Sequence, residues 1–139
     1  PEHPKTIDAQ LELGIILKDK GHYPQAIEQF DELLSQQLLE ANSASEARFY
    51  IGESYQNMGE YRKAIEAYYK VSYHGAEGFS QWITSADFQR ARCHQSLGEH
   101  ATAITVYERI VRREGGQSPQ GEMAQEQIVA LRRSLGNRN

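Results

Sequence analysis

The chain has 139 residues, which is enough for one domain, and its formal net charge is −4. A mildly acidic chain of this kind is a poor electrostatic match for nucleic acid or for anionic lipid, so we expect neither as a partner. No apolar run approaches the roughly 20 residues that a membrane-spanning helix needs, so we expect no membrane insertion. The chain starts at Pro1 without an initiator Met. We therefore expect a fragment of a larger protein, and the sequence leaves the periplasm or cell envelope and the cytoplasm open as compartments.

Helical periodicity runs through the whole chain, and strict alternation of apolar and polar residues is absent. The four prolines lie near predicted helix starts, where proline is tolerated. The sequence therefore predicts an all-α fold of about seven helices. The predicted helices cover about residues 6–20, 23–38, 44–58, 61–74, 81–97, 100–114 and 119–135.

The first six helices form three similar pairs, each joined at a glycine. The same residue types recur at fixed distances from that glycine: Gly21, Ala26, Ile27 and Phe30; Gly59, Ala64, Ile65 and Tyr68; Gly98, Ala103, Ile104 and Tyr107. The repeat distance is 38 and then 39 residues. Glycine can end a helix in the left-handed conformation without a Cβ clash, so it marks a tight turn between the two helices of each pair.

Small residues on both helices of a pair suggest that the two helices lie close together. On the first helices they are Gly14, Gly52 and Ala91. The last predicted helix stands outside the repeat and has one apolar stripe, formed by Ala124, Ile128, Leu131 and Leu135. Since a stack of helices ends in an exposed apolar face, we expect this helix to cover that face and to present a polar outer side.

This pattern resembles the tetratricopeptide repeat (TPR) family. Three copies fit at about residues 7–40, 45–78 and 84–117, followed by a capping helix at about 119–135, so residues 1–139 read as a single TPR domain. The resemblance implies a right-handed superhelix of antiparallel helix pairs. The longer linkers, Ala41–Ala44 and Phe79–Ile83, resemble those of bacterial cell-envelope members, including Tol–Pal-associated periplasmic proteins.

The third copy departs most from the family pattern. Arg90 and His94 stand where an apolar residue and an aromatic residue are expected. We therefore expect its first helix to pack less tightly. Trp82 lies just before that helix, and its segment either lengthens the helix or forms an ordered loop.

The resemblance also implies a concave groove lined by the first helices, where such domains bind other proteins. Its positions carry over to Leu11, Ile15, Lys18, Asp19, Phe49, Glu53, Asn57, Phe88, Arg92 and Gln95. Leu11, Phe49 and Phe88 would form an apolar ladder bordered by charge, which favours an apolar partner segment. The alternative is that these three residues pack between neighbouring first helices.

The predicted function is a protein–protein interaction scaffold that binds a partner peptide or segment in this groove without catalysis. A clamp for a partner's C-terminal carboxylate is not expected, because Leu11 and Ile15 stand where Lys and Asn are needed. Two alternatives stay open: a self-associating module that forms a homo-oligomer, and an auxiliary domain of a larger protein whose activity lies elsewhere.

Catalytic and metal chemistry find little support in the residues. No two histidines are three or four residues apart on one helix, so we expect no metal site and no cofactor. Cys93 occupies a position where the family prefers small side chains. We expect an inert, half-buried thiol there and no nucleophile.

Overall fold

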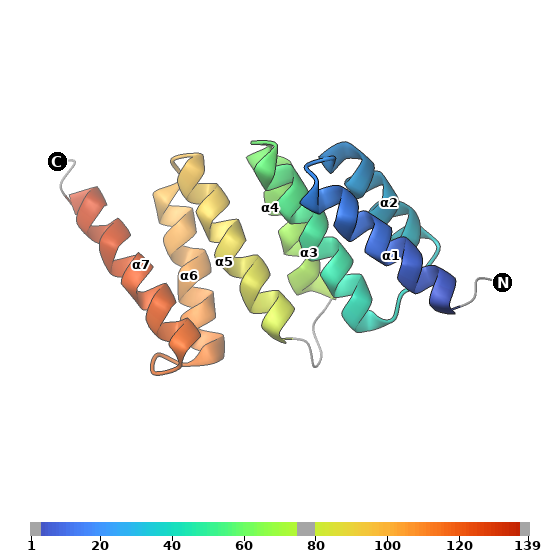
Figure 1. Ribbon diagram of the computed structural model, residues 1–139. Helices are drawn as coiled ribbons and strands as arrows, with labels where there is room; N and C mark the ends of the chain where they lie inside the picture. Colours follow the sequence, from blue (N-terminus) through green and yellow to red (C-terminus); the bar gives the residue numbers. More distant parts are fainter. Residues whose placement is uncertain (1–3, 75–79, 137–139) are drawn as a thin grey trace.

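The computed structural model describes residues 4–74 and 80–136, and these residues form seven α-helices without a strand (Figure 1). The helices are α1 (Pro4–Asp19), α2 (Tyr23–Ser35), α3 (Ala41–Asn57), α4 (Tyr61–His74), α5 (Ser80–Ser96), α6 (His100–Glu114) and α7 (Pro119–Gly136). The all-α prediction and all seven helices are confirmed. None of the described helices is long and apolar enough to cross a bilayer.

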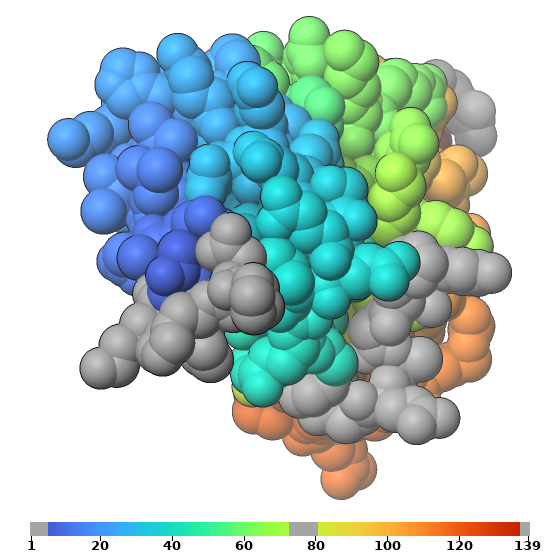
Figure 2. Space-filling model, turned by 90° about the vertical axis from the view of Figure 1, so that its right-hand side faces the viewer, coloured from blue at the N-terminus to red at the C-terminus, as the bar shows by residue number. Residues whose placement is uncertain are grey.

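The helices stack as antiparallel pairs in chain order, α1 with α2, α3 with α4 and α5 with α6, and α7 closes the row (Figure 1). The first helices form one layer and the second helices the other. Viewed from the N-terminal end, α1 and α2 make the outer surface, with α3 beside them (Figure 2). Helices α3 and α5 therefore each pack on their own partner and on the pair before them.

The three turns within pairs have the same geometry, which explains why the same residue types recur at fixed sequence distances from each turn glycine. Gly21, Gly59 and Gly98 have φ angles of 82°, 76° and 78°. In the first turn the His22 N–H donates to the Leu17 carbonyl at 2.8 Å, and the Gly21 N–H donates to the Lys18 carbonyl at 2.9 Å. This pair of bonds is the Schellman motif, which satisfies the last carbonyls of a helix.

Two glycines allow the paired helices to approach closely, as the sequence indicated. A Cβ atom on Gly14 would lie 2.6 Å from the Phe30 ring, and one on Gly52 would lie 2.5 Å from the Tyr68 ring. Both rings are fully buried. Any side chain at these two positions would therefore push the second helix away from the first.

The boundaries differ from prediction at both linkers: residues 80–83 of the predicted linker Phe79–Ile83 belong to α5, residue 79 lies outside the described residues, and the larger difference is at the first linker. Helix α2 ends at Ser35, three residues before the predicted end, and Gln37 has a φ of 56°. Leu39 then packs against the apolar cluster around Phe30, so the chain turns inward there. Helix α3 begins at Ala41, so the predicted linker Ala41–Ala44 is its first turn.

Helix α5 begins at Ser80, and Trp82 therefore lies in its first turn, which decides between the helix and the loop. The expectation that this helix packs less tightly is wrong. Arg90 and His94 are each 8% exposed. Arg90 pairs with Asp87 at 3.2 Å, and His94 Nδ1 forms a hydrogen bond with Glu99 Oε1 at 2.9 Å, and these polar contacts replace the apolar contacts of the other pairs.

Helix α7 covers the end of the stack through the predicted stripe. Ala124, Ile128 and Leu131 are buried against α6, and Leu135 is partly buried. Its outer side is less polar than expected, because Met123 and Val129 are 54% and 45% exposed.

Candidate functional site

The ten predicted groove residues all lie on the first helices. They are Leu11, Ile15, Lys18 and Asp19 on α1, Phe49, Glu53 and Asn57 on α3, and Phe88, Arg92 and Gln95 on α5. The structure divides them by polarity. The apolar members belong largely to the packed interior, whereas Asp19, Asn57 and Arg92 are exposed.

The expected apolar ladder is not an exposed surface. Phe49 is 8% exposed, and its ring centroid lies 5.5 Å from Tyr68 and 5.6 Å from Trp82. Phe88 is partly buried, and its ring centroid lies 5.9 Å from that of Tyr107. Leu11 and Ile15 are partly buried against the apolar cluster around Phe30. Phe49 therefore belongs to the packed interior and is not part of an exposed apolar surface.

Trp82 explains why Phe49 is covered. Its indole lies against both Phe49 and Tyr50, and its Nε1–H donates to Asn42 Oδ1 at 2.9 Å. Asn42 is part of a helix because α3 starts at Ala41. Sequence reasoning missed this contact because the predicted helix began at residue 44.

Lys18 is the centre of the polar part of the groove positions. Its Nζ lies 3.0 Å from Glu53 Oε1 on α3, 3.3 Å from Asp19 Oδ1, and 4.3 Å from the centroid of the Tyr50 ring. Burial lowers the pKa of Lys18, but the hydrogen bond and the charge of Glu53, aided by Asp19, outweigh burial and raise it overall. Lys18 therefore stays charged and ties α1 to α3.

A second acidic group lies on the same pair of helices. The pKa of Glu46 on α3 is raised, first by burial and then by the charge of Glu12 on α1, while Lys18 lowers it. The like charge of Glu12 therefore adds to burial in disfavouring the ionised form of Glu46. Glu12 was not among the predicted site residues, because helix spacing alone does not show which residues of α1 and α3 meet.

The predicted groove residue Gln95 and its counterpart Gln56, next to Asn57 on α3, are each held by a tyrosine of a second helix. The Tyr68 hydroxyl donates to Gln56 Oε1 at 2.6 Å, and the Tyr107 hydroxyl donates to Gln95 Oε1 at 2.6 Å. Gln56 also donates to Gln89 Oε1 on α5 at 3.2 Å. Each amide is thereby held in one orientation, which leaves defined donors and acceptors along the row of first helices.

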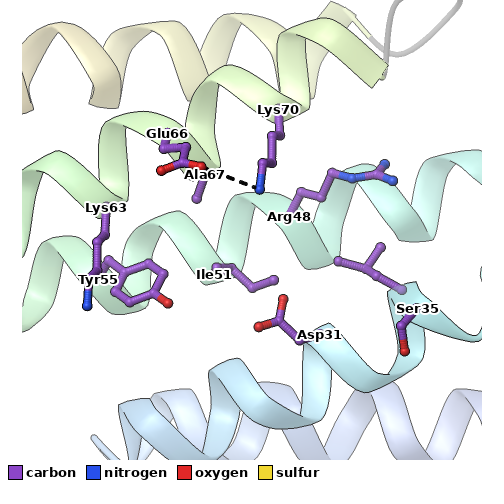
Figure 3. A pocket seen from close by; sticks show the side chains of 10 residues that line it. Asp31, Ser35, Arg48, Ile51, Tyr55, Lys63, Glu66, Ala67 and Lys70 are labelled. Atoms are coloured by element: carbon purple, nitrogen blue, oxygen red, sulfur yellow. Dashed lines mark ion pairs between the residues drawn. The ribbon is translucent and has the colours of Figure 1, made fainter.

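The opposite layer contains a hollow of about 530 Å3 between α2 and α4, with α3 as its floor (Figure 3). Its lining includes Asp31, Arg48, Ile51, Tyr55 and Lys70. Burial lowers the pKa of Arg48, and no carboxylate pairs with it among the described residues. Helical periodicity does not predict this hollow, because it arises where three helices meet.

The described part of the chain holds neither a reactive thiol nor a cluster of metal ligands. Cys93 is fully buried, not half-buried as expected, and burial raises the pKa of its thiol to about 11. A thiol in that state is a poor nucleophile. Residues 4–74 and 80–136 hold no group of three or more His, Cys, Asp or Glu side chains placed to bind a metal ion.

Two tetratricopeptide repeat models match the sequence, one over residues 11–78 and one over residues 85–114. Together with the three helix pairs and their shared turns, these matches show that the chain belongs to the tetratricopeptide repeat family. Its fold is the TPR superhelix. A comparison of the sequence with curated proteins finds no significant match.

Solved structures with this fold include several TPR proteins. The TPR-like repeats of a putative kinesin light chain from Podosopora anserina have a TM-score of 0.74 at 20% identity, covering 98% of this chain and 70% of that one. The Yersinia enterocolitica type III secretion chaperone SycD, in complex with a peptide of the translocator YopD, has a TM-score of 0.75 at 18% identity, covering 95% and 96%. PcrH from Pseudomonas aeruginosa has a TM-score of 0.72 at 17% identity, covering 94% and 95%.

Proposed function

We propose that this chain is a single TPR domain that acts as a protein–protein interaction scaffold without catalysis, and that a partner polypeptide binds along α1, α3 and α5. Function on a repeat fold depends on the side chains that the stack displays. The proposal draws support from the polar groups displayed on these helices. It is also supported by the SycD structure, which contains a bound translocator peptide.

The single observation that carries the proposal is the unbalanced charge between α1 and α3. Burial and, after it, the charge of Glu12 raise the pKa of Glu46, and Lys18, whose charge lowers that pKa, is itself engaged by Glu53 and Asp19. A Lys or Arg side chain of a partner placed between Glu12 and Glu46 would remove this repulsion. The burial of Phe49 argues against the purely apolar partner that the sequence suggested.

Arg92 supplies the opposite charge one repeat further along. Arg92 is exposed on α5, and no carboxylate pairs with it in the described residues. We therefore propose a partner segment that carries a basic residue opposite α1 and α3 and an acidic residue opposite α5. Charge patterns of this kind set the orientation and the specificity of a bound segment.

The test is a selection of peptides from a random library on the immobilised chain, followed by binding measurements with the enriched peptides. We expect enriched peptides to contain Lys or Arg, and we expect Glu46→Gln and Arg92→Glu each to weaken binding about tenfold. Glu28→Gln and Arg112→Glu, at exposed positions on α2 and α6, are the matched controls. Enrichment without basic residues, or equal loss in the controls, would reject the proposal.

The alternative that the domain is an auxiliary part of a larger protein is compatible with the same binding role. It differs in placing an activity outside these residues. The full reading frame of the parent gene distinguishes the two.

A further inference from the structure

Helix α7 has the position of a first helix in a fourth pair. It ends at Gly136, which follows Gly98 by 38 residues, the same distance as between Gly21 and Gly59. Val129 then stands seven residues before this glycine, as Gly52 stands before Gly59. The stripe of Ala124, Ile128 and Leu131 packs on α6, so α7 faces the previous pair in the usual way.

Among the described residues, no helix covers the other side of α7, in contrast to the first two pairs. There, the residue seven before the turn glycine is covered by an aromatic ring of the second helix, Gly14 by Phe30 and Gly52 by Tyr68. Val129 is 45% exposed and lies in a hollow of about 430 Å3. In Figure 1 this helix is the last of the row, and no described helix lies on its outer side. An apolar face of this kind is a candidate contact surface.

The charges around Val129 indicate which kind of molecule would bind to this face of α7. Along this face, Glu122 and Glu126 lie in the first half of the helix and Arg133 in the last turn, with Val129 and Ala130 between them. None of these three charged side chains forms an ion pair within the described residues. The midpoint between Glu126 and Arg133 falls between Val129 and Ala130, so the face is complementary to its own copy turned by 180°.

We propose that α7 is a homodimer interface, in which two copies of the chain pair their α7 helices antiparallel about a twofold axis at Val129 and Ala130. Glu126 of each copy then lies opposite Arg133 of the other, and each pair is made twice, as a twofold interface requires. The small apolar residues at the axis allow the helices to approach closely. Since one helix face is smaller than the roughly 1,200 Å2 of a standard interface, the dimer is weak and depends on concentration.

Exchanging the charges tests the antiparallel arrangement directly. In Glu126→Arg, both cross-pairs become Arg with Arg; in Arg133→Glu, both become Glu with Glu. A mixture of the two variants restores two opposite-charge pairs in the heterodimer, and the double variant restores them in its homodimer. Both positions are exposed, so the melting temperature of every variant should match that of the wild type.

The measurement is sedimentation velocity from about 10 µM to about 1 mM, a range suited to a weak complex. We expect reversible dimerisation of the wild type, a dissociation constant raised about tenfold in each single variant, and recovery in the equimolar mixture. Arg112→Glu on α6 is the control and should dimerise like the wild type. A wild-type monomer throughout, or single variants whose mixture fails to recover, would overturn the proposal. Peptide binding along α1, α3 and α5 should persist in all of these variants, so the two proposals fail independently.

Discussion

The first and second junctions between repeats have the same helical geometry but opposite interiors. We define the first junction as α2, α3 and α4, and the second as α4, α5 and α6. Arg48 and Asp87 stand at equivalent positions, eleven residues before Gly59 and Gly98. Arg48 lines an open hollow, whereas Asp87 is fully buried.

The difference lies in what surrounds the two charges. Asp87 accepts a hydrogen bond from Ser72 Oγ on α4 at 3.0 Å, and lies 3.2 Å from Arg90 on α5 and 3.0 Å from Arg113 on α6. Arg90 also lies over the Tyr69 ring, 5.6 Å from its centroid. The equivalents of Arg90 and Tyr69 in the first junction are Ile51 and Asp31, which are too short to fill the same space. One repeat scaffold thus accommodates either a hollow or a closed polar network.

The largest expected effect is the loss of the second network. Asp87→Ala leaves Arg90 buried without its partner, and breaking a buried charge pair from one side costs about 3–5 kcal/mol. Chemical denaturation measures the change in the free energy of unfolding. The matched variant Asp31→Ala, at the exposed rim of the first junction, should change it by about 0.5 kcal/mol or less. Equal losses would show that the two junctions do not differ in the way described.

A smaller loss is expected from Gly52→Ala. The added methyl group would meet the Tyr68 ring at 2.5 Å, and overpacking of this kind costs about 1–3 kcal/mol. Thermal unfolding followed by circular dichroism reports the change. Gly116→Ala is the control, since a Cβ there meets nothing within 4 Å. A stabilised Gly52→Ala variant would show that the second helix can move away at little cost.

Filling the first junction should stabilise the chain modestly. Asp31→Tyr copies the residue found at the equivalent position of the second junction, Tyr69, and places a ring over the hollow. Cavity-filling substitutions commonly add about 0.5–2 kcal/mol, and we expect the lower part of this range because the site is open to solvent. Chemical denaturation at neutral pH measures this gain in the free energy of unfolding. No gain in Asp31→Tyr would mean that the hollow is too open to be closed by one ring.

The smallest effect concerns pH and the turn of the third pair. Hydrogen bonds from Arg62 and then His94 hold the pKa of Glu99 at about 2, below its usual 4.5. A carboxylate with a depressed pKa stabilises the fold above its usual pKa, and this contribution is lost as the pH falls from about 4.5 toward about 2. In Glu99→Gln, the free energy of unfolding should therefore no longer show this decrease as the pH falls. The corresponding turn residue of the second pair offers the comparison: in Glu60→Gln the slope should persist.

Sequence periodicity predicted the elements well because each pair repeats one local rule. Glycine ends the first helix, and a small residue seven positions earlier receives an aromatic ring. The candidate site was harder to predict from the sequence. Phe49 was expected in the groove, but its burial depends on Trp82 from the next repeat. The role of Asp87 was not predicted, because its partners on α4 and α6 lie 15 and 26 residues away in the chain. Contacts between repeats carry no periodic signal.

The position of Trp82 gives the molecule a built-in optical reporter. It is the only tryptophan of the chain, and its indole is held by Phe49, Tyr50 and Asn42. Its emission therefore senses whether the second and third pairs remain docked, and it is blind to fraying of α7 at the far end. Comparing fluorescence with far-ultraviolet dichroism during denaturation would distinguish a stack that opens at its middle from one that peels from its terminus.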